Sequence, residues 1–298
     1  MKFSKSKNKV LIIGGSGFLG SNVADLLFKN KYHIIIYDKQ NPDKSINFHN
    51  FIKGEISEIK KIEKQIKICK YVINFAAISD LEESSNKPIE TAQTNIIDVI
   101  CLLDLCKKYK IKKFIQASSV YAVSNIGSFY SISKKASEEY IKEYNFKYKL
   151  PYTILRFGSL YGPRSNLNNG LYKMIYQILH NKKIIYNGDS NTIREYIHVA
   201  DASSAVLKAL ENKFNNETIT VTGNYRIKIN DLVALLKEIL NKKIQIKYLK
   251  TTDSVHYSQT PYRFTKEYSK KYIPNLSVNF DEGLLDLTEY IKNNSLEK

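Results

Sequence analysis

Short apolar runs alternate with longer amphipathic segments in the first half of the chain, and this alternation restricts the possible folds more than any other feature of the sequence. Buried strands are predicted at residues 10–13, 34–37, 71–75, 114–117 and 152–156. Helices are predicted between them, at residues 17–30, 56–68, 89–108 and 131–148. Strands that alternate with helices of about 10–15 residues form βαβ units, which build a parallel sheet with helices on both faces. We therefore expect an α/β fold with a doubly wound parallel sheet.

After Gly158 the regular alternation of apolar runs and amphipathic segments ends, and turn-rich stretches such as YGPRSNLNNG separate shorter predicted elements. A chain of 298 residues is also long for one average domain. We expect a first domain at residues 1–158 that contains the parallel sheet. The rest of the chain, mainly residues 159–298, should form a smaller mixed α/β domain.

The composition argues against several classes of protein. The chain has no run of about 18 or more apolar residues, and the apolar stretch at residues 10–13 is too short for a signal peptide. The three cysteines, Cys69, Cys101 and Cys106, lack the spacing of metal ligands, so we expect free thiols in a reducing compartment. A cytoplasmic protein with no metal site and no membrane partner is therefore expected.

The formal net charge of +17 raises the question of a nucleic-acid partner. The excess is almost entirely lysine, since only five of the 46 basic residues are arginine. The lysines are distributed over segments such as KSKNK, IKKIEK and CKKYKIKK rather than gathered beside stacking aromatic residues. This distribution indicates a solvated surface, and no nucleic-acid partner is expected.

Three glycines, Gly14, Gly17 and Gly20, stand between the first predicted strand and the first predicted helix. Glycines at this junction allow a tight turn and let backbone N–H groups approach a pyrophosphate, which the positive end of the helix then stabilises. Asp38 follows the second predicted strand, where a carboxylate accepts hydrogen bonds from the ribose hydroxyls of adenosine and repels a 2′-phosphate. These residues predict NAD as the cofactor in preference to NADP.

A tyrosine and a lysine four residues apart lie on one face of a helix and can form a proton-transfer pair. Three such pairs occur in the chain, Tyr109/Lys113, Tyr130/Lys134 and Tyr262/Lys266. The high content of both residue types makes about three pairs expected by chance, so the spacing alone selects none of them. Only the pair at 130 and 134 follows a predicted strand and opens the next helix.

Several further motifs follow one another along the chain. They are NFAAISD at 74–80, QTNIIDV around Asn95, LRFGSLYGPR at 155–164, REYIHVAD at 194–201 and FDEGLLDLTEYI near the C-terminus. Together with the glycine spacing, they resemble the motifs of the extended short-chain dehydrogenase/reductases, in particular the NAD-dependent epimerase/dehydratase family. The resemblance covers nearly the whole chain. It implies that residues 1–158, completed by about residues 192–223, form a Rossmann-type NAD-binding domain and that residues 159–298 mainly form the substrate-binding domain. It implies NAD, a nucleotide-diphosphate sugar as substrate, and a role in making sugars for capsule or other cell-surface polysaccharides.

The resemblance also implies which residues carry the chemistry. Tyr130 would be the base, and Lys134 and the positive ring of the cofactor would together favour its phenolate. Lys134 would also hydrogen-bond the nicotinamide ribose. A serine at the end of the fifth strand would hydrogen-bond the reacting hydroxyl. Counting from the start of that strand gives Ser119, whereas counting back from the Val-Tyr motif gives a different register, so Ser118 remains an alternative.

Further contacts are implied by the same resemblance. The cofactor would be held by Gly14, Gly17, Phe18, Leu19, Asp38, Glu55, Ile56, Phe75, Ala76, Ala77, Asn95, Tyr130, Lys134 and Phe157. The substrate would be held by Ser79, Ser159, Arg164, Arg194 and Arg263. Among these, Arg194 is the preferred clamp for the diphosphate, because a guanidinium binds phosphate oxygens in a bidentate manner.

Members of the family oxidise a sugar hydroxyl, usually at C4, and differ in the fate of the resulting keto sugar. A 4,6-dehydratase carries an Asp-Glu pair directly after the catalytic threonine, whereas Val120 and Tyr121 follow Ser119 here, which disfavours elimination. A 4-epimerase is expected, with a 4-dehydrogenase that releases the keto sugar, hexose or heptose, as the alternative. An NAD-binding protein without activity is the hypothesis from another class. The joint presence of Ser119, Tyr130 and Lys134 argues against it.

A homodimer or a larger homo-oligomer is also expected. In this family the helices that correspond to residues 89–108 and 131–148 usually pair across a two-fold axis. The two helices carry more apolar residues than one face of a sheet can cover. These residues include Ile96, Val99, Ile100, Leu103 and Ile141, some of which must belong to the core.

Overall fold

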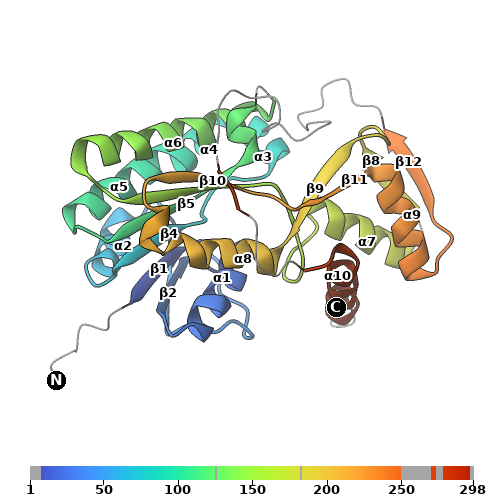
Figure 1. Cartoon of the computed structure of the whole chain (residues 1–298), viewed down its shortest axis with the longest axis horizontal. Coiled ribbons are helices and arrows are strands. Elements are labelled where there is room, and N and C mark those ends of the chain that lie inside the picture. The colour runs from blue at the N-terminus through green and yellow to red at the C-terminus, as the bar shows by residue number, and fades with distance from the viewer. Residues whose placement is uncertain (1–7, 125, 182, 250–269, 273–277, 296–298) are drawn as a thin grey trace.

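The computed structural model of the chain describes residues 8–124, 126–181, 183–249, 270–272 and 278–295. It has a large lobe built on an eight-stranded sheet and a smaller lobe beside it (Figure 1). The strands of the large sheet are β1 (Lys9–Ile13), β2 (His33–Asp38), β3 (Asn50–Lys53), β4 (Tyr71–Asn74), β5 (Lys113–Ser119), β6 (Tyr152–Phe157), β10 (Glu217–Val221) and β13 (Lys270–Lys271). The helices of the large lobe are α1 (Phe18–Lys29), α2 (Ile59–Ile66), α3 (Leu81–Asn86), α4 (Pro88–Ala92), α5 (Asp98–Lys108), α6 (Ser128–Tyr148) and α8 (Val199–Ala209).

The large sheet has the strand order β13-β10-β6-β5-β4-β1-β2-β3. Every neighbouring pair in it runs parallel. Helices α1 and α8 pack on one face of the sheet, and α2, α5 and α6 cover the other. The predicted doubly wound α/β fold of the Rossmann type is therefore confirmed.

The central strands are covered on both faces, which explains their continuous apolar runs. The residues Val10, Leu11, Ile12, Ile34, Ile35 and Ile36 are all 0% exposed. Strand β3, which the apolar pattern does not predict, lies at the edge of the sheet with only its two middle residues half-buried. An edge strand needs fewer apolar residues, so its sequence, NFIK, gives a weak signal.

The smaller lobe is formed by residues that follow β6. Its strands are β7 (Ser159–Tyr161), β8 (Lys183–Asn187), β9 (Ile193–His198), β11 (Tyr225–Lys228) and β12 (Gln245–Leu249). Its helices are α7 (Gly170–Asn181), α9 (Ile229–Leu240) and α10 (Phe280–Ser295). A separate apolar core joins these helices. Between them in sequence, α8, β10 and β13 return to the large lobe, so the chain crosses between the lobes more than once (Figure 1).

The helices differ in detail from those that the sequence predicts. The predicted helix at 89–108 is interrupted, because a π-helical segment at Gln93–Ile97 separates α4 from α5. Helix α6 begins at Ser128, three residues earlier than predicted, after Gly127 with φ of 107°. Among the helices that the structure describes, none is long and apolar enough to cross a membrane.

The parallel strands of the large sheet end at one common edge. Gly14 follows β1, Asp38 ends β2, Phe75 follows β4 and Ser119 ends β5. In open parallel sheets, ligands bind at this carboxyl edge. The fold therefore brings residues that are far apart in the sequence to the place where such a sheet has its site.

Candidate active site

The loop between β1 and α1 is shaped by its glycines. Gly14 has φ of 77°, and a Cβ there would lie 2.7 Å from the backbone nitrogen of Ala76. A Cβ at Gly20 would lie 2.2 Å from the carbonyl oxygen of Gly14, so only glycine lets α1 pack this closely. Gly17 is exposed, and α1 begins directly after it with Phe18, without an acidic residue in its first turn. This end of the helix therefore suits an anion.

Asp38 is held against the same loop. Its Oδ2 accepts a hydrogen bond from the backbone N–H of Ser16 at 2.9 Å, and its Oδ1 accepts one from the N–H of Gln40 at 2.9 Å. Each oxygen of a carboxylate can accept more than one hydrogen bond. The carboxylate is thus fixed beside the glycine loop and keeps capacity for hydroxyl donors.

Asn95 organises the segment that follows β4. It is 1% exposed, its Oδ1 accepts from the N–H of Ile78 at 2.9 Å, and its Nδ2 donates to the carbonyl of Ile78 at 2.9 Å. The same Nδ2 donates to Ser133 Oγ on α6 at 3.0 Å. Phe75, Ala76, Ala77 and Ser79 lie on the segment that these bonds anchor. The structure therefore gives the Asn95 side chain a positioning role, through the loop it fixes.

The other residues predicted to hold a cofactor lie near neighbouring strand ends or at the start of α1. Leu19, the second residue of α1, is half-buried. Glu55 and Ile56 follow β3, where the Tyr37 hydroxyl donates to the Glu55 carbonyl at 3.0 Å. Ile56 packs into the core on one face of the sheet, and Phe157 packs into the core on the other. Their buried side chains leave mainly backbone atoms to contact a ligand.

Ser119, Tyr130 and Lys134 come together beside the end of β5. The Ser119 side chain is hydrogen-bonded to Tyr130, and its Oγ accepts the N–H of Tyr121 at 3.2 Å. The Lys134 Nζ donates to the carbonyl of Ala117 at 3.1 Å and lies 5.7 Å from the centroid of the Tyr130 ring. Tyr130 and Lys134 are 8% and 4% exposed. The three groups form one buried polar cluster.

Burial dominates the ionisation of this cluster. It raises the pKa of Tyr130 to about 12, although the hydrogen bond from Ser119 lowers it. It lowers the pKa of Lys134 to about 8, against the attraction of Glu138. In the chain without cofactor, desolvation thus outweighs the nearby groups that favour the Tyr130 phenolate. The sequence-based expectation, which includes the positive ring of the cofactor, stays a prediction.

Ser118 belongs to a different buried network. Its hydroxyl donates to Glu138 Oε1 at 2.5 Å, and Arg156 donates to the same carboxylate, with Nη2 to Oε2 at 2.6 Å. The Arg156 and Glu138 side chains are 4% and 1% exposed. Successive side chains of a strand point to opposite faces. Ser118 therefore turns away from the cluster that Ser119 joins.

Tyr121 is a further member of the site. Its ring lies edge-on to that of Tyr130, with centroids 6.2 Å apart. Its carbonyl accepts a hydrogen bond from Ser131 Oγ at 2.7 Å, and a Cβ at Gly127 would lie 2.6 Å from its ring. The backbone and the ring of Tyr121 are thus both fixed in position, and the ring packs beside Tyr130.

The residues predicted to bind substrate do not form a cluster like that of Ser119, Tyr130 and Lys134. Arg164 forms an ion pair with Asp25 of α1, with Nη1 2.6 Å from Oδ2, so its guanidinium is already engaged. Arg194 is half-buried on β9, and Ser159 begins β7. Arg263 lies outside the described residues.

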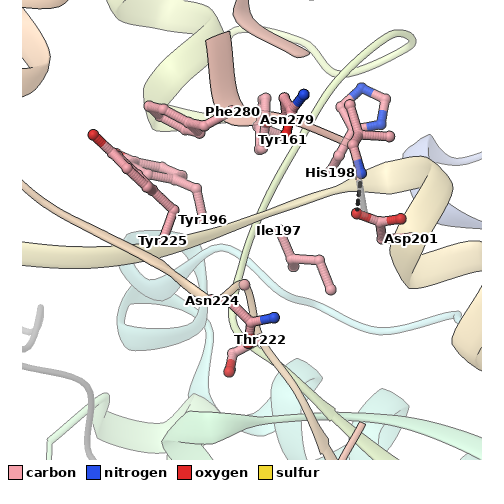
Figure 2. A pocket seen from close by; sticks show the side chains of 12 residues that line it. Tyr161, Tyr196, Ile197, His198, Asp201, Thr222, Asn224, Tyr225, Asn279 and Phe280 are labelled. Carbon is pink, nitrogen blue, oxygen red and sulfur yellow. Dashed lines mark hydrogen bonds between the residues drawn. The ribbon is translucent and has the colours of Figure 1, made fainter. Parts of the chain in front are cut away.

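A separate pocket of about 270 Å³ lies where the lobes meet (Figure 2). It is lined by Tyr161, Tyr196, Ile197, His198, Asp201, Thr222, Gly223, Asn224, Tyr225, Val278, Asn279 and Phe280. Tyr196 and Tyr225 are register partners on adjacent strands and stack on Phe280, and Asp201 Oδ2 accepts the N–H of Val278 at 3.0 Å. Among the described residues, none of those predicted to bind substrate lines this pocket.

The identity of the chain follows from a comparison with protein families. The model of the NAD dependent epimerase/dehydratase family matches residues 10–222. The chain belongs to this family.

Individual members of the family have related structures and sequences. A UDP-glucose 4-epimerase of Thermotoga maritima, solved with UDP-glucose, is 27% identical, with a TM-score of 0.83 over 96% of this chain and 99% of that one. A UDP-glucuronic acid 4-epimerase of Bacillus cereus, solved with UDP-glucuronic acid and NAD, is 25% identical, with a TM-score of 0.83 over 96% and 99%. A dTDP-D-glucose 4,6-dehydratase of Dictyostelium discoideum is 31% identical over 66% of this chain and 54% of that protein. The prediction of an NAD-dependent enzyme of this family is confirmed.

The residues present fit the cofactor of the epimerase/dehydratase family. The glycine loop and the start of α1 offer backbone N–H groups, and the first turn of α1 carries no acidic side chain, as suits a pyrophosphate. Asp38 offers carboxylate oxygens suited to ribose hydroxyls. Gly14, Gly17, Asp38 and Lys134 would hold NAD.

Replacing Asp38 by alanine should narrow the preference of this family member for NAD over NADP by about tenfold, because the carboxylate that repels a 2′-phosphate is lost. The measurement is the ratio of the two dissociation constants by titration calorimetry. Asp43→Ala, which removes an exposed carboxylate from the segment after β2, is the matched control and should leave the ratio unchanged. A wild-type protein that binds NADP more tightly would contradict the role given to Asp38.

Sequence reasoning did not find several residues of the site. Glu138 stands four residues after Lys134 on the same helix face, so the helical period could have indicated it. In the sequence, Tyr121 is notable only as a non-acidic residue where a dehydratase has an acidic one. Its position two residues after Ser119 nevertheless places it near the reacting groups. The aromatic pocket gave no signal, because its residues come from separate elements.

Proposed function

We propose that this chain is an NAD-dependent nucleotide-sugar 4-epimerase. The observation that carries the proposal is the buried cluster of Ser119, Tyr130 and Lys134 at the carboxyl edge of the sheet. The epimerases that the chain resembles act on UDP-sugars by name, so a UDP-hexose or UDP-hexuronate is the substrate class to test first. The product would serve the synthesis of surface polysaccharides.

Tyr130 takes the proton of the C4 hydroxyl in this proposal. Ser119 accepts the N–H of Tyr121, which orients its oxygen. Its single proton, which is engaged with Tyr130 in the structure, would turn to the reacting oxygen once the sugar is bound. Lys134 stabilises the phenolate, since at neutral pH most of it is charged with a pKa of about 8. NAD, when bound, supplies the hydride acceptor and the positive ring charge that the ionisation of Tyr130 requires.

The proposal excludes elimination of water as the main reaction. Elimination from a 4-keto sugar needs an acid and a base at the neighbouring carbons. The 3₁₀ turn Val120–Val123, which directly follows Ser119, carries no carboxylate. Val120 is 2% exposed, and the Tyr121 ring stands against Tyr130. The side chains that directly follow Ser119 therefore offer no carboxyl group to act as the acid or base of an elimination.

Arg194 is the proposed clamp for the diphosphate. Its guanidinium lies on β9 and is half-buried, and its Nη1 donates to the carbonyl of Ile193 at 3.3 Å. Arg164 is held by an ion pair with Asp25 of α1, with Nη1 2.6 Å from Oδ2. Both guanidinium groups already have partners, so the choice of Arg194 rests on the REYIHVAD motif in which it stands.

A screen of UDP-, GDP-, dTDP- and CDP-sugars with product analysis by NMR tests the proposal. We expect a C4 epimer without net formation of NADH. A 4-keto product together with bound NADH would identify a 4-dehydrogenase instead. A 4-keto-6-deoxy product would show elimination and would contradict the role given to Val120 and Tyr121.

We also propose a homodimer formed by α5, α6 and the segment before α5. Of the apolar residues expected at the interface, Val99, Leu103 and Ile141 are at most 1% exposed and belong to the sheet core. These three are therefore among the residues of the two helices that were expected to belong to the core, and this face of the helices covers the sheet. The exposed apolar residues of this surface are Ile89, Ile97, Phe129, Ile132 and Tyr140.

Ile132→Glu should convert a dimer into a monomer at micromolar concentration, because a carboxylate would be buried at the pairing helices. Ile132 is 63% exposed, so the monomer itself should fold normally. The measurement is light scattering after gel filtration. Ile185→Glu, at an exposed position on β8 in the smaller lobe, is the control and should stay dimeric. A monomeric wild type would contradict the proposal.

A further inference from the structure

The edge of the large sheet opposite the active site is strongly basic. Because all neighbouring strands are parallel, the turns and helix ends that precede β2, β4, β5, β6 and β10 meet at this edge. They carry nine exposed lysines, Lys31, Lys67, Lys70, Lys108, Lys110, Lys112, Lys147, Lys149 and Lys213, which we call the basic edge. Seven of the nine lie in the turns themselves, residues 30–32, 67–70, 109–112, 149–151 and 212–216, which contain no aspartate or glutamate. Figure 1 shows this edge where the chain enters β1, at the end of the large lobe away from the smaller lobe.

Direct contacts join neighbouring turns of the basic edge. The N–H of Lys70 donates to the carbonyl of Lys9 at 2.9 Å, and the N–H of Lys112 donates to the carbonyl of Lys70 at 2.8 Å. The ammonium groups of Lys70 and Lys112 lie 6.0 and 5.6 Å from the centroid of the same ring, Tyr71. These lysines, more than 40 residues apart in the sequence, therefore form one continuous surface.

Carboxylates from the flanking elements neutralise part of this charge. Glu63 pairs with Lys108 at 2.7 Å, and Glu211 pairs with Lys213 at 2.9 Å. The turns that carry the lysines contribute no acidic side chain of their own. The surface therefore keeps a positive excess that an anionic partner could neutralise.

Two large apolar side chains stand among these lysines. Ile68 lies between Lys67 and Lys70 and is 52% exposed. Phe146 is 74% exposed, and the Lys149 ammonium donates to its carbonyl at 3.1 Å. Apolar side chains surrounded by lysines are typical of a surface that lies on a bilayer, where the apolar groups enter the headgroup region and the lysines meet anionic lipids.

We propose that the basic edge binds the surface of a bilayer that contains anionic lipids. A nucleic acid is a weaker match, because its phosphates are commonly bound by the fork of arginine. The described arginines, Arg156, Arg164, Arg194 and Arg226, all lie outside the basic edge. The proposal does not depend on the proposed reaction, and it leaves the active site on the side away from the membrane. It departs from the sequence-based expectation of no membrane partner, which rested on the lack of a long apolar run.

The test is co-sedimentation of the purified full chain with large vesicles of phosphatidylcholine and phosphatidylglycerol, 70 to 30, at 150 mM salt. The wild type should partition to these vesicles and not to pure phosphatidylcholine. A variant with Lys67, Lys70, Lys110 and Lys112 all replaced by glutamine should bind at least tenfold less, since each lysine at such a surface is worth roughly five-fold. Phe146→Ser should also weaken binding.

The matched control replaces four exposed lysines of the smaller lobe, Lys173, Lys228, Lys237 and Lys247, by glutamine. It has the same net charge as the first variant and should keep binding within about two-fold. Equal loss in both variants, or equal binding to both kinds of vesicle, would overturn the proposal. Tighter binding to a 20-base-pair DNA duplex than to the anionic vesicles, with Phe146→Ser unchanged, would overturn it in favour of a nucleic-acid partner.

Discussion

Replacement of Tyr130 by phenylalanine should lower kcat by about 10²–10⁴, the usual contribution of a positioned general base, and leave the affinity for NAD nearly unchanged. The ring of Tyr130 would stay in its buried place, because phenylalanine keeps the contact with Tyr121. Only the hydroxyl that is hydrogen-bonded to Ser119 is removed. The measurements are the steady-state rate on the substrate that the screen identifies and the dissociation constant of NAD.

Tyr109→Phe is the matched control for this experiment. Tyr109 and Lys113 have the same spacing as Tyr130 and Lys134, but they precede or begin β5 and so lie at the opposite edge of the sheet. This variant should keep its kcat within about two-fold, since it contacts no reacting group. An equal loss of rate in both variants, or no loss in Tyr130→Phe, would contradict the assignment of the base.

Replacement of Arg156 by methionine should destabilise the fold by about 3–5 kcal/mol, because it leaves the Glu138 carboxylate buried without its cation. The two side chains are 4% and 1% exposed, with Nη2 2.6 Å from Oε2. Lys134 and Ser118 flank the pair, so kcat should fall as well. The measurement is the free energy of unfolding from denaturant titration, monitored by circular dichroism.

The double variant Glu138→Leu/Arg156→Met separates the cost of a broken pair from the value of the pair itself. Replacing both charges by apolar groups of similar size removes the isolated buried charge, so the double variant should be more stable than Arg156→Met alone. A single variant that loses less than about 1 kcal/mol would show that Glu138 finds another partner or becomes protonated at little cost.

The sequence predicted the part of the site that rests on local geometry. Gly14 and Gly20 stand at a strand-to-helix junction where backbone atoms approach closely, and only glycine allows contacts of the kind observed. Asp38 was placed correctly at the end of β2 because a strand buried on both faces has a clear apolar pattern. The spacing of Tyr130 and Lys134 follows from the period of one helix.

Other features depend on registers and contacts that no local pattern encodes. Ser118 and Ser119 are adjacent, so a slip of one residue exchanges the faces of the strand on which they lie. Arg164 meets Asp25 across 139 positions of sequence, and no spacing rule predicts such a pair. The basic edge arises because the sheet gathers turns from five places in the chain. The composition shows that the chain is basic, but only the fold shows that many of the lysines gather at one edge of the sheet.

The most direct test of the central claim follows the hydrogen atoms of the sugar during turnover in D₂O, by NMR of the product. The proposal states that one hydrogen leaves C4 and returns to C4, and that no proton is exchanged at the neighbouring carbons. We therefore expect a C4 epimer that keeps its original hydrogen at C4 and contains no deuterium at C3, C5 or C6. Deuterium at C5 or C6, together with the loss of one water, would contradict the proposed epimerase.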